Sequence, residues 1–530
     1  MQFDLALTLL IIGWAFVLVW VPLIIRSNRK IHPRALFTLF FAEMWERFSY
    51  YGMRAILTLY MAKVLFIDMG DDLARTKAIG IYGAYTAMVY LFPVLGGLVA
   101  DKVFGFRKSI LWGGSLMALG HFTLALAGIP ALESIVLIFY LGLSLIIVGN
   151  GYFKPNISSF LGEFYDKDDA RKDAAFSIFY MGVNVGSLLA TLTCGYVAER
   201  INWHLGFGLA GIGMVLGLIV FWFAVRNGRF EDKGLEPDPE DARSTWKLGL
   251  SKNAIVYLGS LLFLPVVIFF LDLDTVLSAI LSIGSLVVLG YFVFYAFTAK
   301  DKAEGQRLLV VAVLFFFHAV FWALFEQAGS SLTLFAESNV DRMVMGQEIP
   351  ASQFQSLNPL FVIIFAPIMS WLWLRLNKAK KEPSTPMKFV LGLSQLALGF
   401  VVIVLGARFF ADDGLVPIIF LAVMYLFHTT GELSLSPVGL SMVTKLAPGK
   451  IVGFVMGAWF LSISLANSMA GQIGKLTEGS SDSGAELSIM ESLNQYSATY
   501  LTWGVGVVFG AAFLLLLLVP TLRRWMHGIH

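Results

Sequence analysis

Long apolar runs, separated by short polar segments, recur along the whole chain. Each is about as long as the 20 residues or so that a helix needs to cross the hydrocarbon core of a bilayer. The predicted spans are 5–25, 36–60, 74–100, 109–127, 132–160, 174–197, 206–225, 254–271, 277–297, 308–335, 354–376, 387–407, 416–446, 451–476 and 499–518. The pattern predicts an all-α polytopic membrane protein with fifteen spanning helices.

The second run, residues 36–60, is interrupted by polar and charged side chains. They include Glu43, Glu46, Arg47, Tyr50 and Arg54. Their spacing places Glu43, Arg47, Tyr50 and Arg54 on one face of a helix. A charge at the bilayer centre costs ~3 kcal/mol or more, so this face must contact other protein or a water-filled cavity. A purely structural i, i+4 pair of Glu43 with Arg47 is the alternative. Because that pair does not account for the Glu46 carboxylate and the Arg54 guanidinium, we expect an ion or substrate path along this helix.

Basic residues gather in alternate loops, which indicates the orientation of the chain. Arg26, Arg29, Lys30 and Arg34 follow the first run, and Arg523 and Arg524 follow the last. The positive-inside rule therefore predicts an outside N-terminus and a cytoplasmic C-terminus. The start of the chain has no basic region, which argues against a cleaved signal peptide.

Matching loop polarity in two sets of six runs suggests two parallel repeats and alternating access. The predicted parts are an extra N-terminal helix (1–30), a six-helix bundle (31–226), a cytoplasmic linker with two inserted helices (227–304) and a second six-helix bundle with a short tail (305–530). The inserted runs carry no buried base and are expected at the periphery.

Composition narrows the class further. Of the 530 residues, 58% are hydrophobic and 14% are charged, which is typical of a membrane protein. A net charge of +2 argues against nucleic-acid binding. The single cysteine, Cys194, excludes an intrachain disulfide and a structural zinc site of cysteines.

The remaining charges within apolar runs differ in sign between the two sets. Lys154 adds to the basic surplus of the first set, whereas Glu326 and Glu432 make the second set acidic. Cations on one wall and carboxylates on the other suit a dipolar solute such as a zwitterion, because arginine binds a carboxylate bidentately. The structural alternative is a Lys154–Glu326 pair. The two interpretations are compatible if the pair forms in one state and opens in another.

Other polar and aromatic side chains fall in the same runs. The aromatic ones are Tyr50, Tyr51, Tyr90, Trp322 and Trp459, the amides are Asn184 and Asn358, and the imidazoles are His318 and His428. Ordinary helix packing competes with a binding role for each aromatic. The buried amides need partners, and the histidines either relay protons or stay neutral and hydrogen-bonded.

Five stretches resemble signatures of the proton-dependent oligopeptide transporter family of the major facilitator superfamily. They are EMWERFSYYG at 43–52, FKPNIS at 153–158, FYMGVNVGSL at 179–188, FEQAGSS at 325–331 and GELSLSPVGLS at 431–441. The loop that holds Asp101 and Arg107 is similar to the gating loop of the superfamily. The two inserted helices resemble the extra pair of bacterial members, whereas the leading run has no counterpart in the usual pattern.

The resemblance implies a major facilitator fold that imports di- and tripeptides with protons, with no cofactor. It implies peptide-carboxylate contacts by Arg47, Arg54 and Lys154, amino-terminus contacts by Asn184, Asn358 and Glu432, side-chain pockets shaped by Tyr50, Tyr51, Tyr90, Trp322 and Trp459, and proton coupling by Glu43, Glu46, Arg47, Lys154 and Glu326. Animal members have a histidine where this chain has Gly83, so coupling here is expected to rest on carboxylates. We expect a functional monomer in the inner membrane.

Two other solute transporters compete with this interpretation. One is a relative that carries another small solute, such as nitrate. Such relatives often lack both motif carboxylates, which this chain keeps. The other is an outward drug/proton antiporter. An intramembrane enzyme is disfavoured because the sequence contains no G-x-S-x-G or H-E-x-x-H arrangement.

Overall fold

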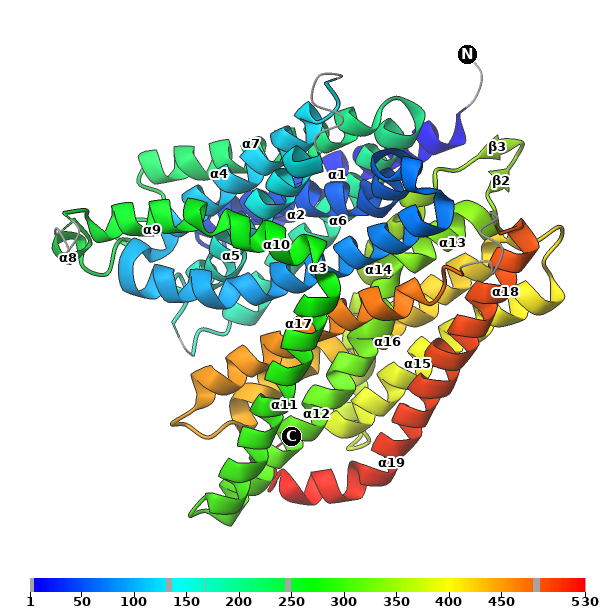
Figure 1. The fold of residues 1–530 in the computed structure, drawn as a ribbon. Helices are drawn as coiled ribbons and strands as arrows, with labels where there is room; N and C mark the ends of the chain where they lie inside the picture. Colours follow the sequence, from blue (N-terminus) through cyan, green and yellow to red (C-terminus); the bar gives the residue numbers. More distant parts are fainter. Residues whose placement is uncertain (1–3, 130–135, 167, 244–248, 480–486, 530) are drawn as a thin grey trace. The chain divides into compact units, whose positions relative to one another are not determined.

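The computed structural model describes residues 4–129, 136–166, 168–243, 249–479 and 487–529, which are mostly helical (Figure 1). Within these residues, thirteen helical segments are long and apolar enough to cross a membrane. One of them, Asp71–Leu126, covers two of the predicted runs, 74–100 and 109–127. The helix α2 (Arg34–Tyr60) is not among the thirteen, because its charged side chains lower its hydropathy.

Each of the fifteen predicted runs coincides with a helix over most of its length. The first residues of the run 132–160 lie outside the described residues. The run 308–335 was wrong at its end: α12 (Lys302–Phe325) stops at a 3-10 turn, Glu326–Gly329, and a separate helix α13 (Ser331–Asn339) follows. The break falls beside Gly329, Ser330 and Ser331, which have low helix propensity, although the apolar pattern continues.

Contacts group the chain into two compact units that alternate along the sequence. The first consists of Met1–Tyr60, Met88–Asp272 and Met343–Pro359, and the second of Met61–Ala87, Leu273–Arg342 and Leu360–His530. The predicted boundaries at residues 30, 226 and 304 follow chain order and stay a prediction.

The first unit contains most of the helices before residue 272. They are α1 (Leu5–Asn28), α2, α4 (Gly105–Leu126), α5 (Val136–Gly162), α6 (Lys172–Arg200), α7 (Trp203–Arg226), α8 (Pro239–Arg243), α9 (Lys252–Leu262) and α10 (Leu264–Asp272). Helix α2 packs against α6 and α7, and α4 packs against α5 and α7. Side-chain caps mark several helix starts; for example, the Asn202 side chain accepts from the His204 and Leu205 amides at the start of α7. Because α2 is enclosed, its charged side chains are buried.

A short segment between α13 and α14 also belongs to the first unit. Strands β2 (Met343–Val344) and β3 (Gln347–Glu348) pair antiparallel, and the 3-10 turn Ala351–Ser356 packs on α6. The connecting residues Met345 and Gly346 both have positive φ, as a type I′ hairpin turn requires.

The second unit contains the remaining helices. They are α11 (Asp274–Thr298), α12, α13, α14 (Leu357–Lys378, from Leu360 on), α15 (Thr385–Phe409), α16 (Ile418–Leu446), α17 (Val452–Lys475), α18 (Ile489–Thr499) and α19 (Val508–Trp525). A π-helical stretch, Tyr500–Val507, joins α18 to α19. Helix α12 packs against α17, and α15 packs against α16 and α19. Strand β1 (Val340–Asp341) pairs parallel with β4 (Val416–Pro417).

Helix α3 (Asp71–Val99) contributes to both units, since its residues up to Ala87 group with the second and the rest with the first. A π turn, Ala100–Phe104, separates it from α4.

The two inserted helical runs divide between the units at the turn that joins them. Tyr140 of α5 donates to Asp272 at the end of α10, with an O···O distance of 3.1 Å. Two residues later, Asp274 at the start of α11 accepts from Gln472 at 2.8 Å and pairs with Lys475, both on α17. Asp272 and Asp274 therefore fasten α10 and α11 to different units.

Helix α1 is attached to the first unit by a few polar anchors. Trp14 donates to Thr193 of α6 at 3.0 Å, and its ring lies 6.3 Å from that of Trp45. Asp4 caps the helix, and its carboxylate also accepts from Tyr196 at 2.7 Å. The Leu7 amide and the Tyr196 hydroxyl lower the pKa of Asp4. Many large apolar side chains of α1 remain exposed, as expected for a peripheral spanning helix.

We expect α1 to be dispensable for transport, because it offers no ionisable side chain within its span. A chain that starts near Ser27 should insert and take up substrate at a rate close to that of the full chain, with a lower melting temperature because the Trp14 and Asp4 anchors are lost. Uptake and thermal denaturation of both proteins measure this. Loss of transport in a well-folded shortened chain would show instead that α1 regulates the cycle.

Candidate functional site

The charged side chains of α2 form a compact ion group. Arg47 Nε lies 2.7 Å from Glu43 Oε1 and 3.0 Å from Glu46 Oε2. Their side chains are 7%, 4% and 0% exposed. The i, i+4 pair expected from the sequence is thus present, and Glu46 joins it. With both carboxylates ionised, the group carries a net charge of −1, and the guanidinium is held by its own helix.

Further along α2, Arg54 and two tyrosines form an aromatic and cationic cluster. The Arg54 guanidinium carbon lies 5.7 Å from the centre of the Tyr51 ring. The Tyr50 and Tyr51 rings meet edge to face with centres 5.2 Å apart. Tyr50 and Arg54 are buried, whereas Tyr51 is half-buried. The contact keeps the Arg54 charge beside a ring face, which stabilises a cation.

Lys154 lies on α5 against an aromatic ring of α3. Its Nζ is 3.8 Å from the centre of the Tyr90 ring, and both side chains are half-buried. The two helices approach closely here because Gly96 faces Gly151: a Cβ on Gly96 would lie 1.9 Å from the Gly151 carbonyl oxygen. These glycines bring Tyr90 and Lys154 together, whereas the predicted roles of the two side chains stay predictions.

The two predicted amides differ in their surroundings. Asn184 is buried on α6, and its Nδ2 donates to the Tyr180 carbonyl 3.0 Å away. Asn358, at the start of α14, is only half-buried, so its prediction as a buried amide was wrong. Both belong to the first unit. The NH₂ group of Asn184 is thus satisfied by a backbone carbonyl of α6, the helix that carries it.

The predicted gating loop lies at the π turn between α3 and α4. Asp101 is exposed there, whereas Arg107 is bound to the polar segment after α7. Its Nε donates to the Lys233 carbonyl at 2.7 Å, and its guanidinium also donates to the Glu231 carbonyl. Arg107 thus holds the linker in place. Its role as a gate stays a prediction.

In the second unit, Glu326 lies in the 3-10 turn where α12 ends, with 3% of its surface exposed. The next residue, Gln327, fixes this turn to α17 by donating to the carbonyls of Ala323 and Ala470, both at 3.0 Å. Its Oε1 accepts from Ser331 at 2.6 Å. Glu326 therefore lies in a 3-10 turn and not in the α-helix, and the contacts of Gln327 hold the backbone of this turn in place.

His318 connects the two predicted pocket tryptophans. Trp322 Nε1 donates to His318 Nε2 at 2.8 Å, and the rings of His318 and Trp459 lie 4.2 Å apart at 33°. The other nitrogen, Nδ1, lies 2.8 Å from the Ser462 hydroxyl, which itself donates to the Trp459 carbonyl. Nε2 must therefore be an acceptor and Nδ1 the donor. His318 is therefore a neutral, hydrogen-bonded imidazole that holds Trp322 by a hydrogen bond and contacts the Trp459 ring. A neutral, hydrogen-bonded imidazole is the second of the two alternatives predicted for it.

Glu432 lies on α16 and is half-buried, one turn after His428. His428 is 1% exposed, and its Nε2 has no hydrogen-bond partner among the described residues. Lys154 belongs to the first unit, whereas Glu326 and Glu432 belong to the second. The Lys154–Glu326 pair and the complementary walls of a cavity therefore stay predictions.

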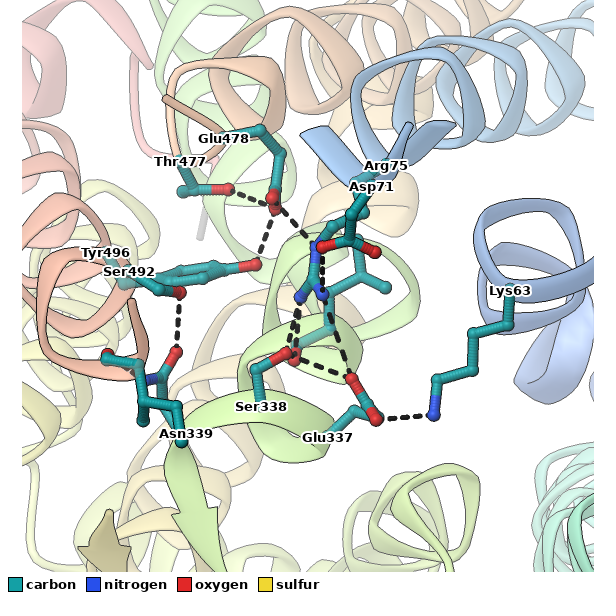
Figure 2. A network of polar contacts seen from close by, with 12 residues as sticks. Lys63, Asp71, Arg75, Glu337, Ser338, Asn339, Thr477, Glu478, Ser492 and Tyr496 are labelled. Atoms are coloured by element: carbon teal, nitrogen blue, oxygen red, sulfur yellow. Dashed lines mark hydrogen bonds and ion pairs between the residues drawn. The ribbon is translucent and has the colours of Figure 1, made fainter. Parts of the chain in front are cut away.

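A second polar cluster, which the sequence did not suggest, centres on Arg75 at the start of α3 (Figure 2). Its Nε donates to Glu478 at 3.0 Å, its Nη2 donates to Ser338 at 2.6 Å, and its Nη1 lies 3.8 Å from Glu337. The full Arg75 cluster comprises Lys63, Asp71, Arg75, Glu337, Ser338, Thr477, Glu478 and Tyr496. It joins α3, α13, α18 and the turn after α17 within the second unit.

The Arg75 cluster also controls the ionisation of Glu337. Burial raises the pKa of Glu337, but Lys63, Arg75 and the Ser338 hydroxyl outweigh this effect and hold the pKa below its ordinary value. A carboxyl group whose pKa is lower in the folded state than in the unfolded state stabilises the fold at pH values above its unfolded-state pKa. This stabilisation is lost as the pH falls through the folded-state pKa. This part of the second unit should therefore loosen in acid.

The long apolar helices of the described residues are those of a polytopic membrane protein. The comparisons agree: a model of the POT family, PTR2, matches residues 107–490, and the chain belongs to this family. The transporter YclF of Bacillus subtilis, described as uncharacterized, is 39% identical over 500 residues, covering 94% of this chain and 96% of that protein. A di-/tripeptide transporter of Lactococcus lactis is 37% identical over 465 residues, covering 85% and 90%.

A solved structure is also similar along most of the chain. The crystal structure of a peptide transporter POT in complex with sulfate is 35% identical and superposes with a TM-score of 0.79. The match covers 94% of this chain and 96% of that chain. The major facilitator fold expected from the motifs is therefore confirmed.

Proposed function

We propose that this protein imports di- and tripeptides together with protons by alternating access. The observation that carries the proposal is the buried ion group of α2, in which both Glu43 and Glu46 hold Arg47. Protonation of either carboxylate weakens this hold and frees the guanidinium to bind a peptide carboxylate. Substrate binding and proton binding are thereby coupled at one side chain.

The other predicted residues take the roles implied by the family motifs. Arg54 and Lys154 bind the peptide carboxylate with Arg47, and Asn184, Asn358 and Glu432 bind its amino terminus. Tyr50, Tyr51, Tyr90, Trp322 and Trp459 shape the side-chain pockets. Glu326 and Lys154 take part in proton coupling, and Asp101 and Arg107 belong to a cytoplasmic gate. The protein acts as a monomer without a cofactor, in the inner membrane, with its N-terminus outside.

Uptake of labelled dialanine into proteoliposomes tests the function directly. An inward proton gradient should drive accumulation, and a protonophore should abolish it. Accumulation that depends on nitrate or a drug instead of peptide would favour the alternative family relative, and peptide efflux driven by the same gradient would favour an antiporter. Failure of all peptide transport in folded protein would contradict the proposal.

Lys154→Ala should reduce driven uptake to background, because a charged side chain in a spanning helix is costly and is kept for a role in binding or coupling. Lys475→Ala removes a lysine of similar burial that pairs with Asp274, and it should keep most of the uptake. The comparison uses initial rates at equal protein density. Wild-type uptake by Lys154→Ala would remove this residue from the site.

His318→Phe should change peptide selectivity and leave proton coupling intact. Phenylalanine keeps a ring beside Trp459 but accepts no hydrogen bond from Trp322, so the indole is freed to turn. We expect the KM of dipeptides with bulky side chains to change several-fold more than that of dialanine. If the variant instead loses gradient-driven accumulation but keeps exchange, His318 carries the proton, and its assignment as a neutral, hydrogen-bonded imidazole is wrong.

A further inference from the structure

The Glu46 carboxylate has a contact from a neighbouring helix that the proposed function leaves unused. Asn150 of α5 donates through Nδ2 to Glu46 Oε1 at 3.2 Å, while Arg47 Nε approaches the other oxygen. Neither Glu46 nor Asn150 has any exposed surface. The carboxylate is therefore held by a cation on its own helix and by an amide on α5.

The opposite end of the same amide is unsatisfied. Asn150 Oδ1 is buried and accepts no hydrogen bond from the described residues. A buried acceptor without a partner is costly, so the amide gains from any donor that comes within reach. A half-turn of the side-chain amide exchanges its oxygen and its NH₂ group at almost the same positions.

This chemistry matches both forms of Glu46. The NH₂ group donates to the ionised carboxylate, as the structure has it. After Glu46 binds a proton, its O–H becomes a donor, and the turned amide presents Oδ1 to accept it. One side chain thus satisfies the carboxylate before and after proton uptake, and no further group has to move.

The backbone that carries Asn150 is held firmly on both sides. A Cβ at Gly149 would lie 2.5 Å from the Gly113 carbonyl oxygen of α4, and a Cβ at Gly151 would lie 2.9 Å from Phe92 of α3. These close approaches fix the position of α5 at Asn150. The amide can turn, but its Cα cannot easily withdraw from Glu46.

Few other ionisable groups face Glu46. Arg47 and Glu43 lie on its own helix, and Lys154 lies one turn beyond Asn150 on α5. On α4, His121 contacts Ser49, which lies three residues beyond Glu46 on α2. The charged residues of α6 and α7, which also pack on α2, lie in the first or last turns of those helices: Lys172, Asp173, Glu199 and Arg200 on α6 and Arg226 on α7.

We propose that Asn150 is a positioning residue that partners Glu46 in both protonation states and thereby sets the pH at which the transported proton binds. The proposal rests on the proposed role of Glu46 in coupling. Because a hydrogen bond to a charged acceptor is the stronger one, Asn150 favours the ionised form overall. Its removal should therefore let Glu46 take up a proton at a higher pH.

The test is the pH dependence of gradient-driven dialanine uptake by two variants. Asn150→Leu removes both the donor and the acceptor, and Asn150→Asp keeps the shape but adds a second carboxylate, which favours proton binding more strongly. We expect the midpoint of the uptake profile to move to higher pH in both, and further in Asn150→Asp. If Asn150→Leu does not fold, Asn150→Ala takes its place, because it also removes both the donor and the acceptor without adding a charge beside Glu46.

Asn156 supplies a matched control on the same helix. It is a buried amide that donates only to the backbone carbonyls of Tyr152 and Gly96, at 2.7 and 3.4 Å. Asn156→Leu should lower stability without moving the midpoint. An unchanged midpoint in both Asn150 variants, with only a lower overall rate, would reduce Asn150 to a structural residue and overturn the inference.

A Glu46→Gln background separates this inference from the proposed function. If Glu46→Gln still accumulates dialanine, Glu46 does not couple proton and peptide transport, and the inference about Asn150 is wrong as well. If Glu46→Gln is uncoupled while Asn150→Leu and Asn150→Asp keep the wild-type midpoint, the inference alone is wrong. Where both hold, Asn150→Leu on the Glu46→Gln background should produce no shift in the pH profile of the remaining exchange.

Discussion

Glu46→Gln is expected to abolish concentrative uptake of dialanine while exchange of peptide for peptide continues. One proton that moves down a gradient of one pH unit releases about 1.4 kcal/mol, which supports a peptide gradient of about tenfold. Glutamine cannot carry that proton, so the ratio of inside to outside peptide should fall towards about one. Arg47 keeps its 2.7 Å contact with Glu43, so the site should remain assembled.

Glu326→Gln should behave in the same way, because Glu326 is the buried carboxylate of the turn that Gln327 fixes to α17. Glu491→Gln is the matched control. Glu491 is an exposed carboxylate in the capping box of α18, and glutamine can still accept from the Ser488 amide. Both transport modes are measured in the same batch of proteoliposomes.

Continued accumulation by both glutamine variants would place the proton site elsewhere. His318 would then be a poor candidate, because both its nitrogens are engaged by Trp322 and Ser462. His428 would be the better one, since its Nε2 has no partner among the described residues.

The ion group of α2 was predictable from the sequence because its members are close along one helix. Arg47 follows Glu43 by four positions, and that spacing alone sets the distance between the two side chains in a helix. The length and apolar character of the other helices were predictable for a related reason: the bilayer demands a hydrophobic run of known length.

The features that the sequence did not reveal depend on distant parts of the chain or on breaks in a helix. The end of α12 at Phe325 was missed because Leu332, Leu334 and Phe335 continue the apolar pattern beyond the turn. Asn150 drew no attention between two glycines, although a polar residue in an apolar run is a signal that could have found it.

Arg75 was missed because nothing local identifies its partners. It lies near the start of a run, where a charge costs little, so its burial could not be expected. Glu337 and Glu478 approach it only after the second unit has folded, and each looks like an ordinary polar residue of a connecting segment.

Arg75→Ala is expected to destabilise the second unit strongly. The Arg75 side chain is 10% exposed and that of Glu478 is 5% exposed. Removal of one partner of a buried ion pair leaves the other charge uncompensated, which costs about 3–5 kcal/mol. The Ser338 and Leu334 acceptors also lose their donor. Thermal denaturation in detergent should show a clearly lower midpoint.

Lys63→Ala provides the comparison, because Lys63 pairs with Glu337 in the same cluster but is 42% exposed. An exposed pair contributes about 0–1 kcal/mol, so this variant should melt close to the wild type. Adding Glu478→Gln to Arg75→Ala should recover part of the loss, since no unpaired charge then stays buried beside Tyr496. Equal melting of the Arg75→Ala and Lys63→Ala proteins would mean that solvent reaches the cluster and that Arg75 does not hold α3, α13 and α18 together.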